Sequence, residues 1–170
     1  MKAILLFVTL FAIDIHHPDL QVYRRLLDQS LENKEAANQF YKQLSTVNED
    51  SDPTLLGFKA MSEFMLCKHL FNPMSKLSHF NKGRALLEKA IQKNNLDPEL
   101  LYFRLSTQSN VPSVLRYSGN INADKLALIS YLKKEASDSQ ADQHVYKRIK
   151  AYLLINQYCT AEEKELIKNL

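Results

Sequence analysis

Apolar residues recur along most of this chain at steps of three and four, the spacing that places them on one face of an α-helix. Leu20, Tyr23, Leu27 and Leu31 form the first such stripe. After this first helix, at 19–32, further helices are expected at about 36–47, 53–70, 78–93, 98–108, 123–134 and 141–158, with a short last one from Thr160. No alternating Val-, Ile- or Thr-rich run indicates a strand. The pattern predicts an all-α fold of seven to eight helices, arranged as stacked antiparallel helical hairpins.

Three of these helices have strong start signals. Asp52-Pro53 and Asp97-Pro98 each combine a residue that caps free backbone N–H groups with a proline suited to the first helical position. Thr160 and Glu163 have the spacing of a capping box. The helix from Pro53 is apolar almost all round, so we expect it to be the most buried.

Two of these starts belong to an internal echo. Residues 52–59 and 97–104 share the pattern D-P-x-L-L-x-F-[KR], 45 residues apart. A helix that places a leucine pair and a phenylalanine toward different neighbours suits a stack of repeated helical units. Coincidence between two good helix starts is the alternative explanation.

The segment 82–108 resembles the junction between two tetratricopeptide repeats. Gly83, Leu87 and Ala90 match that family's small–large–small pattern, and Asp97-Pro98 matches the turn into the next unit. The family repeats every 34 residues, so the resemblance implies an insertion of about 11 residues around Phe71–Leu77. Through 68–77 and 108–124 the chain is also similar to small, uncharacterised, signal-bearing helical proteins of Bacteroidetes-type bacteria. That resemblance implies export and a helical fold, and no particular activity.

The N-terminus has the composition of a secretory signal. Met1-Lys2 precedes an unbroken apolar run, Ala3–Ala12, which Asp14 ends. A permanent membrane span needs about 20 apolar residues, so we expect no stable span. We expect 1–12 to be a signal peptide, 13–170 to be one helical domain, and the protein to be periplasmic or secreted. The alternative is a cytoplasmic protein in which the run is a structural first element.

Composition excludes several kinds of site. Only three of the 170 residues are glycine, too few for a phosphate-binding loop, and the five histidines lack metal-ligand spacing. The 22 basic residues are interspersed with 19 acidic ones, and the net charge is only +3. Nucleic acid is therefore not an expected partner. Cys67 and Cys159 lie far apart and are expected to be unpaired core thiols. We therefore expect no enzyme, no cofactor, no metal and no disulfide.

The remaining candidate is a surface formed by two links, Phe71–Leu77 and Ser109–Asn120. Each follows one of the echoed helices, so a stack of hairpins would place both on one edge. The candidate binding residues are Phe71, Lys76, Arg104, Gln108, Arg116 and Tyr117. The alternative is structural: the prolines end helices, and the apolar residues fill the ends of the core.

Three functions remain open. The preferred hypothesis is an exported, non-enzymatic module whose curved stack offers a groove to a peptide or protein partner in the cell envelope. The second is a small-molecule binder or hydrolase in which Arg104, Arg116 and Tyr117 hold an anionic group in a basic pocket between the loops. The third is a cytosolic helical adaptor. The sequence does not set the oligomeric state.

Overall fold

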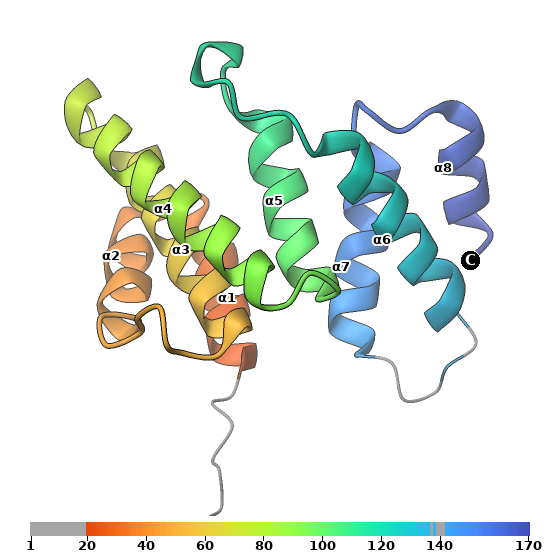
Figure 1. The fold of residues 1–170 in the computed structure, drawn as a ribbon, viewed down its shortest axis with the longest axis horizontal. Helices are drawn as coiled ribbons and strands as arrows, with labels where there is room; N and C mark the ends of the chain where they lie inside the picture. Colours follow the sequence, from red (N-terminus) through yellow and green to blue (C-terminus); the bar gives the residue numbers. More distant parts are fainter. Residues whose placement is uncertain (1–19, 137, 139–141) are drawn as a thin grey trace, which may run out of the picture.

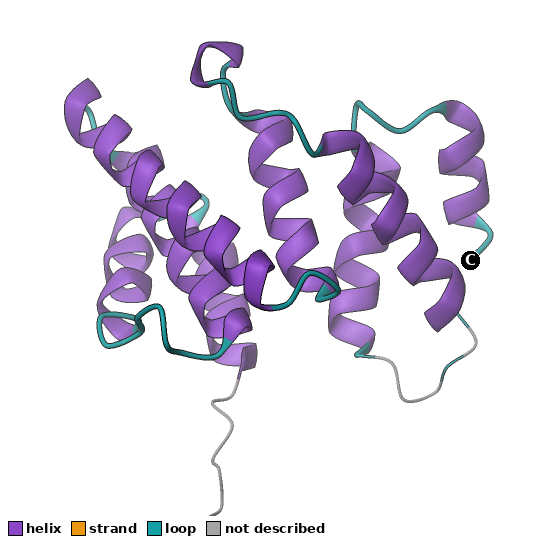
Figure 2. Ribbon diagram, in the orientation of Figure 1, coloured by secondary structure: helices purple, strands orange, loops and turns teal. Residues whose placement is uncertain are grey.

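The fold is all-helical in the computed structural model, which describes residues 20–136, 138 and 142–170. Within these residues there are eight α-helices, one 3-10 turn and no strand (Figures 1 and 2). The helices are α1 (Leu20–Ser30), α2 (Lys34–Gln43), α3 (Pro53–His69), α4 (Pro73–Lys93), α5 (Pro98–Asn110), α6 (Ile121–Glu135), α7 (Gln143–Ile155) and α8 (Ala161–Lys168), with η1 at Ser113–Leu115. The expected fold class is confirmed. The expected signal peptide, 1–12, lies outside the described residues.

Consecutive helices pair as hairpins: α1 with α2, α3 with α4, α5 with α6, and α7 with α8. Each later odd-numbered helix also packs on both helices of the preceding hairpin. Thus α3 contacts α1 and α2, α5 contacts α3 and α4, and α7 contacts α5 and α6. This is the arrangement of a helical-repeat stack, in which each unit covers an apolar face of its neighbour.

The echoed segments begin equivalent helices. Asp52 and Asp97 are both N-caps, and each carboxylate accepts the backbone N–H groups two and three residues further on. Asp142 caps α7 in the same way, again 45 residues after the previous cap. We did not identify this third start from the sequence because Gln143 replaces the proline and Val145-Tyr146 replaces the leucine pair. The aspartate-capped helix start therefore occurs three times at intervals of 45 residues, at α3, α5 and α7.

Direct contacts between equivalent helices form the centre of the core. Phe58 and Phe103 are fully buried, and their rings meet edge to face with centroids 5.1 Å apart. Gly57 lets α5 approach closely, since a Cβ there would lie 2.2 Å from Cδ2 of Leu100. Ten consecutive residues of α3, from Leu56 to Met65, are buried. This agrees with the expectation that the helix from Pro53 is deeply buried.

The predicted break at Phe71–Leu77 was too long. Asn72 accepts the N–H groups of Met74 and Ser75, and Pro73 occupies the first helical position, so α4 begins there. Only Leu70–Asn72 separate α3 from α4. The implied insertion is therefore not a loop: the residues are taken up by long helices, 17 residues in α3 and 21 in α4.

The antiparallel hairpins give the molecule two distinct edges. The links at 31–33, 70–72, 111–120 and 156–160 join the two helices of each hairpin and lie on the upper side of the view in Figure 1. We call this edge, with the helix ends that flank it, the turn rim. The opposite edge holds the links between hairpins and the caps Asp52, Asp97 and Asp142. We call it the cap edge.

Candidate functional site

The link between α5 and α6 is fixed by a buried tyrosine. The Tyr117 ring packs edge to face on Phe80 of α4, with centroids 5.9 Å apart, and its hydroxyl donates to Glu88 Oε1 at 2.7 Å. Arg84 covers the ring, with Cζ 4.9 Å from its centroid. Burial, followed by the hydrogen bond to Glu88, raises the pKa of Tyr117. The side chain is therefore a neutral anchor that holds the link against α4.

Gln108 closes the base of the same link. Its amide donates to Asn120 Oδ1 at 3.2 Å, and its carbonyl accepts the Asn120 N–H at 3.1 Å. At the start of the link, Ser109 accepts from Asn156 and Gln157, which follow α7. Side chains from two neighbouring hairpins thus tie down both ends of the link.

Arg104 is an interior ion-pair residue. It donates twice to Asp124 of α6, at 2.8 and 2.7 Å, and once to Glu88 of α4, at 2.9 Å. The hydrogen bonds to Asp124, then its charge, raise the pKa of Arg104 despite burial. Two carboxylates already compensate the guanidinium, so it offers no free positive charge to an anionic ligand.

The middle of the link is presented to solvent. The side chain of Val114, in η1, is 81% exposed. Arg116 is exposed and has φ 47° and ψ 46°, the left-handed conformation that costs a residue with a Cβ about 1–2 kcal/mol. No carboxylate in the described part of the chain pairs with Arg116. The link therefore presents an apolar tip beside an uncompensated cation.

The six predicted site residues fall into two groups. Arg104, Gln108 and Tyr117 are buried and bonded within the fold. Phe71 and Arg116 are exposed and Lys76 is half-buried, and these three lie on the turn rim. Both links do lie on one edge of the stack, as expected (Figure 1). The first group supports the surface that the second group presents.

Exposed apolar side chains concentrate on the turn rim. Phe71 is 94% exposed, Met74 75% and Ile155 79%. Of the ten large apolar side chains that are exposed among the described residues, seven lie on this rim: Leu31, Phe71, Met74, Leu77, Val114, Ile155 and Tyr158. Every hairpin contributes at least one of them, so the feature belongs to the whole edge. Only Phe71 and its neighbours were suggested by the sequence, because exposure depends on what each turn leaves uncovered.

The inner face of the stack is bridged by ion pairs. Arg24 of α1 donates twice to Glu99 of α5, at 2.8 and 2.7 Å, and lies 3.0 Å from Asp142 at the start of α7. Asp28 of α1 pairs with Arg148 of α7 at 2.6 Å. Side chains of α1 therefore reach α7 across α5. An α-helix is about 10 Å wide, so a helical partner could not lie between α1 and α7 at this point.

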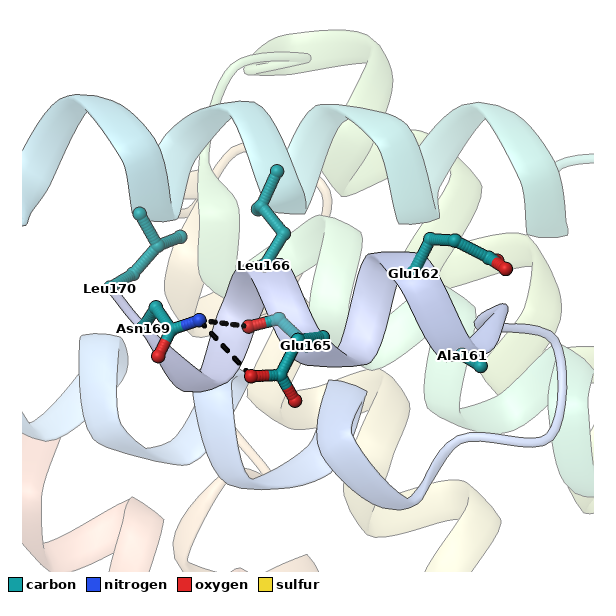
Figure 3. A pocket seen from close by; sticks show the side chains of 6 residues that line it. All are labelled: Ala161, Glu162, Glu165, Leu166, Asn169 and Leu170. Carbon is teal, nitrogen blue, oxygen red and sulfur yellow. Dashed lines mark hydrogen bonds between the residues drawn. The ribbon is translucent and has the colours of Figure 1, made fainter.

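A shallow hollow lies on α8. Its volume is about 770 Å³, it is wide open to solvent, and its lining residues are Ala161, Glu162, Glu165, Leu166, Asn169 and Leu170. The amide of Asn169 bonds to Glu165 on the same helix (Figure 3). Its charged lining is acidic, and none of the predicted site residues lies there.

Few groups in the described residues are arranged for chemistry. His79 Nδ1 lies 2.5 Å from Glu63 Oε2, and the Tyr41 ring packs edge-on against the imidazole. Both Cys67 and Cys159 are free, and burial raises the pKa of each thiol, which favours the unreactive protonated form. No cluster of three metal-ligating side chains occurs in the part of the chain that the structure covers. None of the described helices is long and apolar enough to cross a bilayer.

Comparisons with known proteins gave no match, whether with family models, with curated proteins or with solved structures.

Proposed function

We propose that this protein is a non-enzymatic docking module that attaches through its turn rim to another component of the cell envelope. The observation that carries the proposal is the collection of exposed apolar side chains from all four hairpins on one edge. Exposed apolar side chains collected on one part of a protein are typical of interaction surfaces, whereas single ones scattered over a surface are ordinary.

The supported link at 111–120 strengthens this proposal. Tyr117 and Gln108 fix the link from inside, while Val114 faces solvent and Arg116 is held in a costly conformation. Strained backbone that the surrounding structure maintains is concentrated at functional sites. If the link only joined two helices, glycine at position 116 would adopt the same backbone conformation without this cost.

Two further parts of the proposal come from the sequence. The resemblance of 82–108 to tetratricopeptide repeats suggests a scaffold for contacts with other molecules, and the stacked hairpins are compatible with it. The apolar run Ala3–Ala12 supports export. N-terminal sequencing of the mature protein tests export: a start near residue 13 is expected, and an intact Met1 in a soluble cytoplasmic pool would contradict it.

Site-specific photo-crosslinking in living cells tests the docking edge. A photoreactive residue is placed at Phe71, Val114 or Ile155 on the rim, and at Leu96 on the cap edge as the matched control, since Leu96 is 84% exposed. We expect adducts, whether with protein or with lipid, at the rim positions and few at Leu96. Equal labelling at both edges would contradict the proposal, because docking would then have no preferred edge.

A further inference from the structure

We infer that the component bound by the turn rim is the anionic surface of a lipid bilayer, with the rim side chains inserted among the headgroups. This inference rests on the proposed function, because it names the partner of the same edge. Three observations carry it: the apolar side chains protrude, the charges separate between the two edges, and the rim is supported from within.

The shape of the rim suits a fluid surface better than a folded partner. Phe71 and Val114 lie on turns, at the ends of helices, and are among the most exposed side chains of the described chain. The hollow described above lies elsewhere, on α8. In a protein complex, anchor side chains of one partner fit into pockets or grooves of the other. A bilayer needs no such pocket, because its acyl chains rearrange around apolar side chains that enter it.

Basic residues lie at the centre of the turn rim, as binding to an anionic surface requires. The two central turns, 68–78 and 109–120, contain Lys68, Lys76 and Arg116 and no acidic residue. Arg84 lies next to them, on the Tyr117 ring. Glu32, Glu35, Glu162 and Lys34 lie only toward the ends of the rim, and Glu32 is 3.3 Å from Lys68. The centre of the rim is therefore positive.

The cap edge has the opposite character. Its carboxylates are those of Glu49, Asp50, Asp52, Asp97, Glu135, Asp138 and Asp142, and they outnumber the lysines at the helix ends there, Lys42, Lys93, Lys133 and Lys134. Of these lysines, Lys93 has its ammonium bound to the carbonyls of Glu49 and Ser51. A molecule with one basic, apolar edge and one acidic edge is oriented by a negative surface, rim inward. Each Lys or Arg near such a surface strengthens binding about fivefold.

The absence of tryptophan from the sequence allows a clean test. Two full-length variants, Phe71→Trp and Leu96→Trp, each carry one tryptophan at a strongly exposed position, on opposite edges. They are mixed with vesicles of phosphatidylglycerol and phosphatidylethanolamine. We expect the emission of the Phe71→Trp protein to shift to the blue and to resist aqueous quencher, and that of Leu96→Trp to stay unchanged.

Co-sedimentation with the same vesicles measures the affinity. We expect Phe71→Ser/Met74→Gln/Val114→Asn to lower partitioning at least tenfold, and Arg116→Gln to lower it about fivefold. Leu96→Gln is the matched control and should bind like wild type. All variants keep the apolar run Ala3–Ala12, so a difference in binding between them comes from the substituted side chains.

The outcomes separate the two proposals. Equal binding by the triple variant and wild type, or equal binding to neutral phosphatidylcholine vesicles, would overturn the lipid inference. If the cellular crosslinks from rim positions are to proteins and purified protein ignores vesicles, docking through the rim stands and the lipid partner is rejected.

Discussion

Phe58 and Phe103 occupy equivalent positions 45 residues apart and pack directly on each other, with ring centroids 5.1 Å apart. Equivalent residues of the two echoed segments are therefore in direct contact in the structure. A second contact joins the helix starts, where the Thr54 hydroxyl donates to the Asp97 carboxylate at 2.6 Å. The spacing of α3 and α5 thus depends on side chains that lie within the two echoed segments.

The close approach of these helices predicts a sensitive glycine. Gly57→Ala would place Cβ 2.2 Å from Cδ2 of the fully buried Leu100, so α5 or Leu100 must move. Overpacking costs about 1–3 kcal/mol and exceeds the helix propensity that alanine adds, so we expect a loss of about 1–2 kcal/mol in the free energy of unfolding. Urea denaturation measures it. Gly119→Ala is the control, since nothing lies within 4 Å of its Cβ, and should change stability by less than about 0.5 kcal/mol. Equal effects would contradict the close packing.

The anchor at Tyr117 predicts how the link will loosen. Tyr117→Phe removes one hydrogen bond to Glu88 and should cost about 1 kcal/mol, with the link still in place. Tyr117→Ala also removes the ring from Phe80, so we expect a loss of about 3–5 kcal/mol and much faster hydrogen exchange in 111–119. Exchange measured by mass spectrometry distinguishes the two variants. Unchanged protection of 111–119 in Tyr117→Ala would show that the ring does not hold the link.

The strained residue predicts a separation of stability from docking. Arg116→Gly relieves the left-handed conformation and should raise the free energy of unfolding by about 0.5–1 kcal/mol. Arg116→Ala keeps the strain and removes the charge, so its stability should stay near that of wild type. Both variants should dock less well through the rim. A glycine variant less stable than the alanine variant would mean that the conformation is not strained.

The ion pair at the start of α7 predicts a pH dependence. Burial by itself would raise the pKa of the Asp142 carboxyl, but N–H donors from Val145 and His144 and the charge of Arg24 together lower it. A carboxyl with a lowered pKa stabilises the fold above its ordinary pKa, near 4, and loses that contribution as the pH falls through the lowered value. We expect Asp142→Asn to be less stable than wild type at pH 7, with the difference shrinking below about pH 4. Denaturation curves across that range measure it, and a constant difference would contradict the assignment.

Local signals in the sequence predicted most of the fold. The caps Asp52 and Asp97 and the Thr160–Glu163 capping box are all present, because each is formed by groups two or three residues apart. The sequence prediction starts α4 too late, because the cap Asn72 lies inside the segment predicted as a break, Phe71–Leu77. The cap at Asp142 can be located in the sequence by counting 45 residues on from Asp97.

The candidate surface was less predictable, for a physical reason. Arg104 and Tyr117 look like binding residues in the sequence, and the structure turns both inward to Glu88, a residue on another helix. Periodicity shows which face of a helix is apolar, but not which neighbour compensates a charge. Nothing in the sequence marks Ile155 as exposed. It is an apolar residue like those of the core, and it is exposed only because the turn after α7 does not cover it.

Because Asp52, Asp97 and Asp142 start successive units in register, residues 52–96 form a module with matching junctions at both ends. A second copy of that module placed after residue 96 would have a capped helix start on each side, but it would separate α1 from α5 and α7 and so remove the ion pairs of Arg24 with Glu99 and of Asp28 with Arg148. Each added step of 45 residues would extend the turn rim by one hairpin, at the expense of the contacts by which α1 closes the stack.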